Sequence, residues 1–272
     1  MRVRGPRLMR FRRNKPTDAN TTSLPAWKTY QAQINALADL PLNFEWEKTH
    51  DYNEASGWRV DDYEAELPNE PPGAPIPSGP WEIAKRMIHD YKFPDPNIVT
   101  GIFVPEDTLE KRVMLLRAHA YGLTFYFGVR VGNVIDEERE DPQGGGRQRV
   151  WGFNYRTLQG HYERGQIDFT VVKWLNTGKV AFHIHAFSQT GEIRNIFIRI
   201  GFRLLGRRVQ KRFVQRAMER MQELVRDELR SQAQGQESAV VANIPTVPIE
   251  VAGAGADEKV ADKMAEVTDT AQ

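Results

Sequence analysis

The chain has 272 residues and a formal net charge of +1, with 37 Lys and Arg against 36 Asp and Glu. It contains no cysteine, which excludes disulfides, thiolate catalysis and cysteine-bound zinc or iron–sulfur centres. No run approaches the roughly 18–20 apolar residues that span a bilayer as a helix, and the arginine-rich start lacks the apolar stretch of a secretory signal. We therefore expect a cytoplasmic protein, with a peripheral position at a membrane left open.

Both ends of the chain differ in composition from its middle. Residues 1–24 begin with a cluster of Arg and Lys, and residues 233–272 are acidic and rich in Ala, Gly and Val. We predict a disordered basic arm and a disordered acidic tail, because neither segment can bury enough apolar surface to fold. The basic arm either contacts phosphate or anionic lipid, or only keeps the chain soluble.

Residues 25–56 are predicted to form an amphipathic helix and an extended segment. The helix, over residues 25–40, has Trp27, Tyr30, Ile34 and Leu37 at helical spacing. A strand over residues 57–67 follows, and a proline-rich stretch ends it. Pro80 then suits the first position of a second helix, whose apolar residues are Trp81, Ala84, Ile88 and Tyr91.

Strands dominate the chain between residues 98 and 188. Alternating apolar residues predict a hairpin about Tyr121 and Gly122, and the turn at residues 176–178 joins the last two strands. Residues 144–146 are three glycines without the Lys and Ser or Thr of a phosphate-binding loop, so we expect a flexible connection. The predicted strands cover residues 98–104, 112–120, 123–136, 149–155, 166–174 and 179–188.

The last folded element is also the longest. Apolar residues recur at helical spacing over residues 194–232, with Gly201 or Gly206 as a candidate break. A helix, an antiparallel sheet and a long closing helix favour an α+β fold of the helix-grip type over residues 57–232. In that fold a curved sheet wraps around the C-terminal helix and leaves a cavity between them. Other α+β arrangements fit the same order of elements.

The stretch from Trp151 to Ser188 carries the densest motif of the chain. Together with the basic segment at residues 206–213, it resembles the uncharacterised protein family 0548, a bacterial and plant family of unknown function, most strongly over residues 151–221. The resemblance implies a helix-grip (Bet v 1/START-like) fold, whose members hold apolar ligands, and it implies no established activity. The matching positions are Tyr155, Thr157, Leu158, Gly160, His161, Gly165, Ala186, Phe187 and Ser188.

Three positions depart from the family pattern. Arg156 stands where the family has glycine, Gln159 where it has proline, and Gln166 where it has glutamate. An amide neither takes up a proton nor carries charge, so Gln166 cannot act as a general base or as an anionic metal ligand. Any acid–base role would then pass to His161 or Asp168, and the departure favours a protein that is not a catalyst.

The motif also supplies the candidate site residues. We predict that a ligand contacts Trp151, Phe153, Tyr155, Thr157, His161 and Phe169, because the apolar concave face of a helix-grip sheet is its pocket. His161 and Asp168 are the candidate catalytic residues. The alternative is structural: Gly160 supplies an unusual backbone angle, and His161 ties the turn to a neighbouring carbonyl.

Two histidines on one strand raise the question of a metal. His183 and His185 share a face, opposite Phe182 and Ile184. Two imidazoles need a third ligand from elsewhere in the chain, for example His119 or His161, and none is evident in the sequence pattern, so we predict no metal and no cofactor. Ser188 lacks the strand-to-helix elbow of a serine nucleophile.

Three functions remain open. The first is a non-catalytic protein that binds an apolar or lipid-like small molecule between sheet and C-terminal helix. The second is a membrane-surface or protein-interaction module that uses a basic helix surface. The third is a hydrolase-type enzyme that uses His161. Nucleic acid is not expected as a partner, because no reader motif accompanies the charge. The basic surface consists of Arg199, Arg203, Arg207, Arg208, Lys211 and Arg212.

Overall fold

A computed structural model describes the backbone of residues 25–191 and 196–242, and the side chains of residues 25–191 and 206–234. The predicted basic arm (residues 1–24) and residues 243–272 of the predicted acidic tail lie outside the described residues. Residues 233–242, the predicted start of that disordered tail, are helical instead. The chain divides into a unit that ends at Leu229 and a second unit from Arg230 onward, and the site lies in the first. No helix in the described part is long and apolar enough to cross a membrane.

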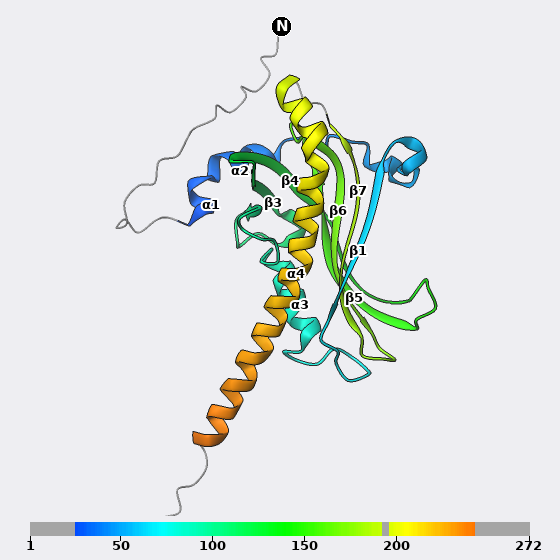
Figure 1. Cartoon of the computed structure of the whole chain (residues 1–272), viewed down its shortest axis with the longest axis vertical. Coiled ribbons are helices and arrows are strands. Elements are labelled where there is room, and N and C mark those ends of the chain that lie inside the picture. Colours follow the sequence, from blue (N-terminus) through cyan, green and yellow to red (C-terminus); the bar gives the residue numbers. More distant parts are fainter. Residues whose placement is uncertain (1–24, 192–195, 243–272) are drawn as a thin grey trace, which may run out of the picture. The chain divides into compact units, whose positions relative to one another are not determined.

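The core of the first unit is one antiparallel sheet of seven strands (Figure 1). Its order, β1-β7-β6-β5-β4-β3-β2, confirms the predicted α+β class. The predicted hairpin is present, and Tyr121 and Gly122 both have positive φ, at 51° and 75°, as its tight turn requires. The strands are β1 Arg59–Leu67, β2 Val99–Ile102, β3 Val113–Ala120, β4 Leu123–Glu140, β5 Arg147–Thr157, β6 Glu163–Trp174 and β7 Val180–Thr190.

Two short helices cover one end of the outer face of the sheet. The helix predicted over residues 25–40 is two helices, α1 Ala26–Thr29 and α2 Gln31–Ala38, separated at Tyr30. Ile34 of α2 packs with Ile102 and Leu115. The segment that follows contains the short 3-10 helices η1 Trp46–Asp51 and η2 Glu54–Ser56, and a third, η3 Leu109–Lys111, precedes β3.

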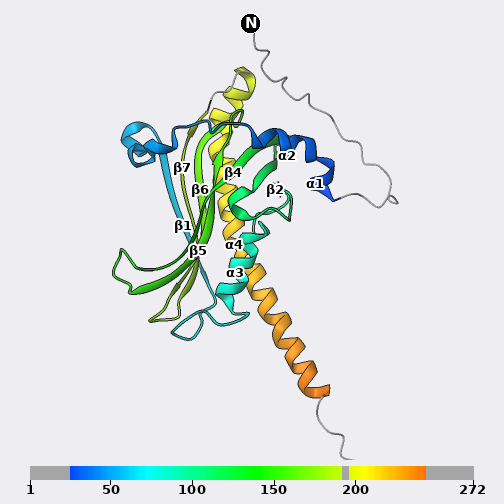
Figure 2. The same ribbon diagram turned by 180° about the vertical axis from the view of Figure 1, so that it is seen from behind.

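The inner face of the sheet is covered by two longer helices, α3 Pro80–His89 and α4 Ile196–Ala242 (Figures 1 and 2). Val214, Ala217, Met221 and Val225 of α4 belong to the same buried cluster as α3 and the inner residues of β5, β6 and β7. The helix-grip arrangement is therefore present. The helix α4 continues without interruption through Gly201 and Gly206, so neither glycine breaks it.

The helix α3 packs beside α4 on the inner face of the sheet, a position that the sequence did not predict. Trp81, Ile83, Ala84 and Ile88 of α3 are at most 1% exposed. Phe93, in the loop after α3, packs its ring 4.8 Å from that of Phe169. These side chains occupy the interior in which a helix-grip cavity was expected.

A buried ion pair anchors the start of α3 to the sheet. Lys173 of β6 and Glu70 lie 2.7 Å apart, and both side chains are fully buried. The second Glu70 oxygen accepts a hydrogen bond from the amide of Trp81 at 2.8 Å, and so satisfies an amide in the first turn of α3. Lys173 also donates to the carbonyl of Ala74 at 2.9 Å. The pair thus fixes both the proline-rich loop and the helix against β6.

Removing one partner of this pair tests its role. Lys173→Met leaves the Glu70 carboxylate buried without a cation, and we expect a loss of about 3–5 kcal/mol of unfolding free energy. The double variant Lys173→Met/Glu70→Gln should recover part of that loss, because no buried charge remains and the amide oxygen can still accept from Trp81. Urea denaturation of the three proteins measures both values. A cost below about 1 kcal/mol for Lys173→Met would contradict the anchoring role.

Candidate functional site

The Gly-His turn connects β5 to β6 at one end of the sheet. The hydroxyl of Thr157 accepts a hydrogen bond from the amide of Gly165 at 2.9 Å and donates to Asn43 Oδ1 at 2.6 Å. Asn43 Nδ2 donates in turn to the carbonyl of Glu163 at 2.8 Å. Gly165 has φ +147°, and a Cβ there would lie 2.1 Å from the carbonyl oxygen of Phe187. The motif therefore has a structural use: it ties β5 and β6 to the segment before η1.

His161 completes the turn as a hydrogen-bond acceptor. Its Nδ1 accepts from the amide of Glu163 at 3.0 Å, and its ring lies 4.6 Å from that of Phe127. Burial lowers the pKa of His161 to about 4. The imidazole is therefore neutral near pH 7, and its Nδ1 is engaged with an amide, not with the carbonyl that the structural alternative supposed.

The inner face beside this turn has a floor of mostly small side chains. We call Gly165 and Ile167 of β6 together with Ala186 and Ser188 of β7 the inner floor. These residues pair across β6 and β7, Gly165 with Ser188 and Ile167 with Ala186. Ile167, Ala186 and Ser188 are partly exposed, although α4 crosses this face. In the next cross-strand rows toward α3, by contrast, the side chains are large and buried.

Those buried rows contain three of the six predicted ligand contacts. Phe153 and Phe169 are fully buried, and Trp151 is 5% exposed. Trp151 faces α3, with Lys85 over its ring. Tyr155 borders the inner floor, because it pairs with Ile167 across β5 and β6. Of the six predicted contacts, Tyr155, Thr157 and His161 thus lie at the floor, and the other three are part of the packed interior.

Charged groups from α4 and the sheet meet above the inner floor. Arg207 donates to both oxygens of Asp61 at 2.5 and 2.6 Å, and this arginine holds the pKa of the Asp61 carboxyl below its usual range. Gln210 donates to Glu163, whose carboxylate lies 3.6 Å from Arg59. Burial raises the pKa of Glu163. The negative charges of the two carboxylates thus balance the positive charges of the two arginines.

Two open grooves lie on the described part of the chain, and both are away from α4. An open groove of about 570 Å³ lies along β4, lined by Glu110 and residues 132–137. Another of about 200 Å³ lies beside α1, with Trp27 and Phe103 in its wall. Neither groove is lined by α4. Any ligand contact on the inner face must therefore begin at the partly exposed floor.

His161 and Asp168 lie on opposite faces of the sheet. Asp168 belongs to the outer row Asn154–Asp168–His185, as the cross-strand pairs place it. Burial raises its pKa, and its carboxylate accepts from Gln166 at 3.0 Å. The structure therefore does not bring the two candidate catalytic residues into one pocket.

The departures from the family pattern at residues 156 and 166 form a pair on the same outer face. Arg156 and Gln166 are direct cross-strand partners, and Arg156 Nε donates to Gln166 Oε1 at 3.0 Å. The guanidinium of Arg156 also lies 3.2 Å from the ring centre of Trp46. Both residues act in packing η1 onto the sheet, away from the inner floor.

The two strand histidines also face outward. His185 pairs with Asp62 at 2.6 Å, and His183 Nε2 lies 3.4 Å from Glu64. Within the described residues, no group of three or more His, Asp or Glu side chains is arranged to hold a metal ion.

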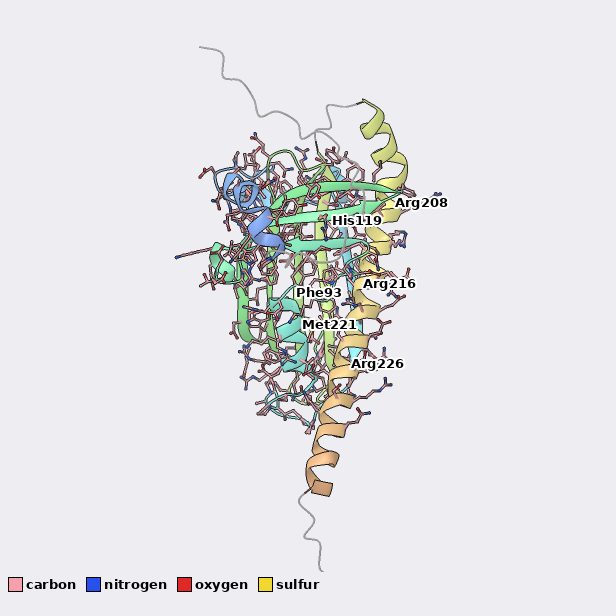
Figure 3. The ribbon with its side chains drawn as sticks, turned by 90° about the vertical axis from the view of Figure 1, so that its left-hand side faces the viewer. Phe93, His119, Arg208, Arg216, Met221 and Arg226 are labelled. Atoms are coloured by element: carbon pink, nitrogen blue, oxygen red, sulfur yellow. The ribbon has the colours of Figure 1, made fainter. Side chains whose placement is uncertain are left out.

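The predicted basic surface is only partly available. Arg207 is paired with Asp61, whereas Arg208, Lys211 and Arg212 are exposed. The side chains of Arg199 and Arg203 lie outside the described residues. Figure 3 shows Arg208 and Arg226 directed away from the sheet, and Met221 on the opposite side of α4.

The sequence analysis missed the acids above the floor. The alternation along β1 could have placed Asp61 inward with Tyr63 and Ala65, because the three share a face. Nothing local in the sequence indicates that Asp61 meets Arg207, a residue 146 positions later.

Comparison with known proteins gives a family and distant likenesses. The family model DUF1990, a domain of unknown function, matches residues 45–220. The curated proteins gave no match. Among solved structures, the crystal structure of Ara h 8.0201 has TM-score 0.38 and 13% identity, over 63% of this chain and 99% of that one. That of TTHA0849 from Thermus thermophilus has TM-score 0.37 and 15% identity, over 61% and 97%. Likenesses this distant do not bear on a ligand.

The lowered pKa of His161 predicts a pH dependence of stability. The unfolded chain binds this proton near pH 6.5 and the folded chain only near pH 4. The unfolded state therefore holds more protons in that interval, and stability falls as the pH falls through it. The loss should reach about 3 kcal/mol by pH 4.

His161→Asn isolates this contribution. Asparagine Oδ1 can still accept from the Glu163 amide but does not titrate. We expect the difference in unfolding free energy between wild type and variant to shrink by about 3 kcal/mol from pH 6.5 to pH 4. Urea denaturation across this range measures it, and two parallel curves would contradict a buried neutral imidazole.

Proposed function

The chain belongs to the DUF1990 family, and from its inner floor we propose that it binds a small apolar molecule without transforming it. The observation that supports this proposal is the change in exposure along the inner face. Phe153, Phe169 and Ile184 are at most 1% exposed, whereas Ile167 and Ala186 in the next row are partly exposed under α4. Covering them with an apolar ligand removes apolar surface from water.

The surroundings of the floor suit an amphipathic or aromatic ligand. The partly buried rings of Tyr63, Phe127 and Phe213 pack against the same core, and the paired charges of Asp61, Arg207, Glu163 and Arg59 lie at the rim. Because those charges balance, we propose an uncharged ligand. The narrower assignment to uncharacterised protein family 0548 is also a proposal, and it rests on the matching positions in the Gly-His motif.

The other two functions have less support. A hydrolase needs a base and its partner in one pocket, and Asp168 is on the face opposite His161. A membrane or protein contact of the basic surface stays a prediction, because the three exposed cations Arg208, Lys211 and Arg212 are also typical of a solvated helix face.

Filling the floor tests the proposal. Ala186→Phe places a ring over Ile167 and Ser188, and we expect it to weaken binding of the neutral fluorescent probe N-phenyl-1-naphthylamine at least about tenfold, through loss of the contact area. Fluorescence titration measures the affinity, and thermal unfolding checks that the variant is folded. Ser188→Leu serves as a second filling variant.

A matched control adds the same ring to the other face. Val60 lies on the outer face of β1 and is 36% exposed, so Val60→Phe should leave probe binding unchanged. Native mass spectrometry of the purified protein would show a carried molecule directly. The proposal fails if folded Ala186→Phe binds the probe as tightly as wild type, or if wild type does not bind it.

A further inference from the structure

Tyr91 ends α3 in a backbone conformation that tyrosine rarely adopts. Its φ is +52°, and it follows the C-cap residue Asp90. The amide of Tyr91 donates to the carbonyl of Ile88 at 3.0 Å, and that of Lys92 donates to Met87 at 2.9 Å. Glycine is the usual residue at this position of such a helix end. A bulky residue kept there against its backbone preference suggests a use for its side chain.

Packing accounts for the ring of Tyr91 but not for its hydroxyl. The ring lies 5.3 Å from that of Phe93 and 6.0 Å from that of Phe169, and phenylalanine would make the same contacts. The hydroxyl oxygen is buried, and no group in the described part of the chain meets it in good hydrogen-bond geometry. Its polar neighbour is the hydroxyl of Tyr155. Because a poorly paired buried hydroxyl is unfavourable in the folded protein, an acceptor on a bound molecule would stabilise it.

The hydroxyl is close to the inner floor. The ring of Tyr155 lies 6.3 Å from that of Tyr91, and Tyr155 is the strand neighbour of Ile167. Burial raises the pKa of Tyr155 to about 12 and that of Tyr91 well above its usual value. Both groups are therefore neutral phenols that can donate a hydrogen bond at the border of the floor.

We propose that the Tyr91 hydroxyl, with that of Tyr155 beside it, donates a hydrogen bond to a neutral carbonyl oxygen of the molecule bound on the inner floor. This inference rests on the proposed function and names the chemical class of the ligand. A neutral carbonyl fits better than a carboxylate, because the charges of Arg207 and Arg59 are balanced by those of Asp61 and Glu163. Arg59 Nε has no hydrogen-bond partner in the described part of the chain, but a carboxylate bound there would add an uncompensated negative charge to this group.

Two probes of the same shape separate the hydrogen bond from apolar contact. 2-Acetylnaphthalene carries a carbonyl, and 2-ethylnaphthalene carries a methylene group in its place. We expect wild type to bind the acetyl compound about tenfold more tightly, as one hydrogen bond to an otherwise poorly paired donor allows. Tyr91→Phe should bind both probes equally, with the affinity for 2-ethylnaphthalene unchanged. Equilibrium dialysis measures the four affinities.

Thermal unfolding distinguishes a ligand contact from a structural role of the hydroxyl. If the hydroxyl stabilised the fold, Tyr91→Phe would lower the unfolding midpoint. Because Tyr91→Phe removes a poorly paired buried group, its unfolding midpoint should equal or exceed that of wild type. The matched control is Tyr121→Phe, since Tyr121 also has positive φ, at 51°, but is 64% exposed. That variant should keep the preference for the acetyl compound.

The outcomes distinguish the two proposals. If wild type binds both naphthalenes with equal affinity, or if Tyr91→Phe keeps the tenfold preference, the carbonyl contact is wrong while the floor remains a binding site. A clearly lowered unfolding midpoint of Tyr91→Phe would show that the hydroxyl serves the fold and would also overturn the inference. If wild type binds neither compound, the proposed function itself fails.

Discussion

The buried pair between Glu70 and Lys173 determines where α3 lies on the sheet. It fixes the proline-rich loop and the first turn of α3 against β6, and so holds a whole helix inside the grip. Because α3 and Phe93 then occupy the inner face from Phe169 onward, the part of that face left open is the end beside the Gly-His turn. The position of the proposed site thus follows from an interaction far from it in sequence.

Because side chains alternate along each strand, most apolar and most polar side chains lie on opposite faces of the sheet. Most inward residues of β5, β6 and β7 are apolar or small, with the buried Lys173 as an exception that is paired with Glu70. Outward residues include Arg156, Gln166 and Asp168. The outer polar groups pair with one another and with η1. This separation explains why His161 and Asp168 do not meet, and why Arg156 and Gln166 do not reach the inner floor.

Alternation and turn residues are local signals, and they were sufficient to predict the strands and the hairpin turns. The helix-grip class needed in addition the resemblance to a known family, because other α+β folds fit the same order of elements. The sequence could not show that α3 fills the interior, because helical periodicity marks an apolar face without saying what covers it. The same limit applies to Glu70 with Lys173 and to Asp61 with Arg207, which join residues 103 and 146 positions apart. Tyr91 was recognised as an apolar helix residue, but its poorly paired hydroxyl is visible only in three dimensions.

The central claim is that ligand binding is confined to the inner floor while α3 stays in place. A crystal structure of the protein with 2-acetylnaphthalene tests it most directly. We expect the naphthalene ring against Ile167 and Ala186, the carbonyl oxygen within hydrogen-bond distance of the Tyr91 hydroxyl, and the Glu70–Lys173 pair unbroken. A ligand that displaces α3 from the sheet, or that lies in the groove along β4, would contradict it.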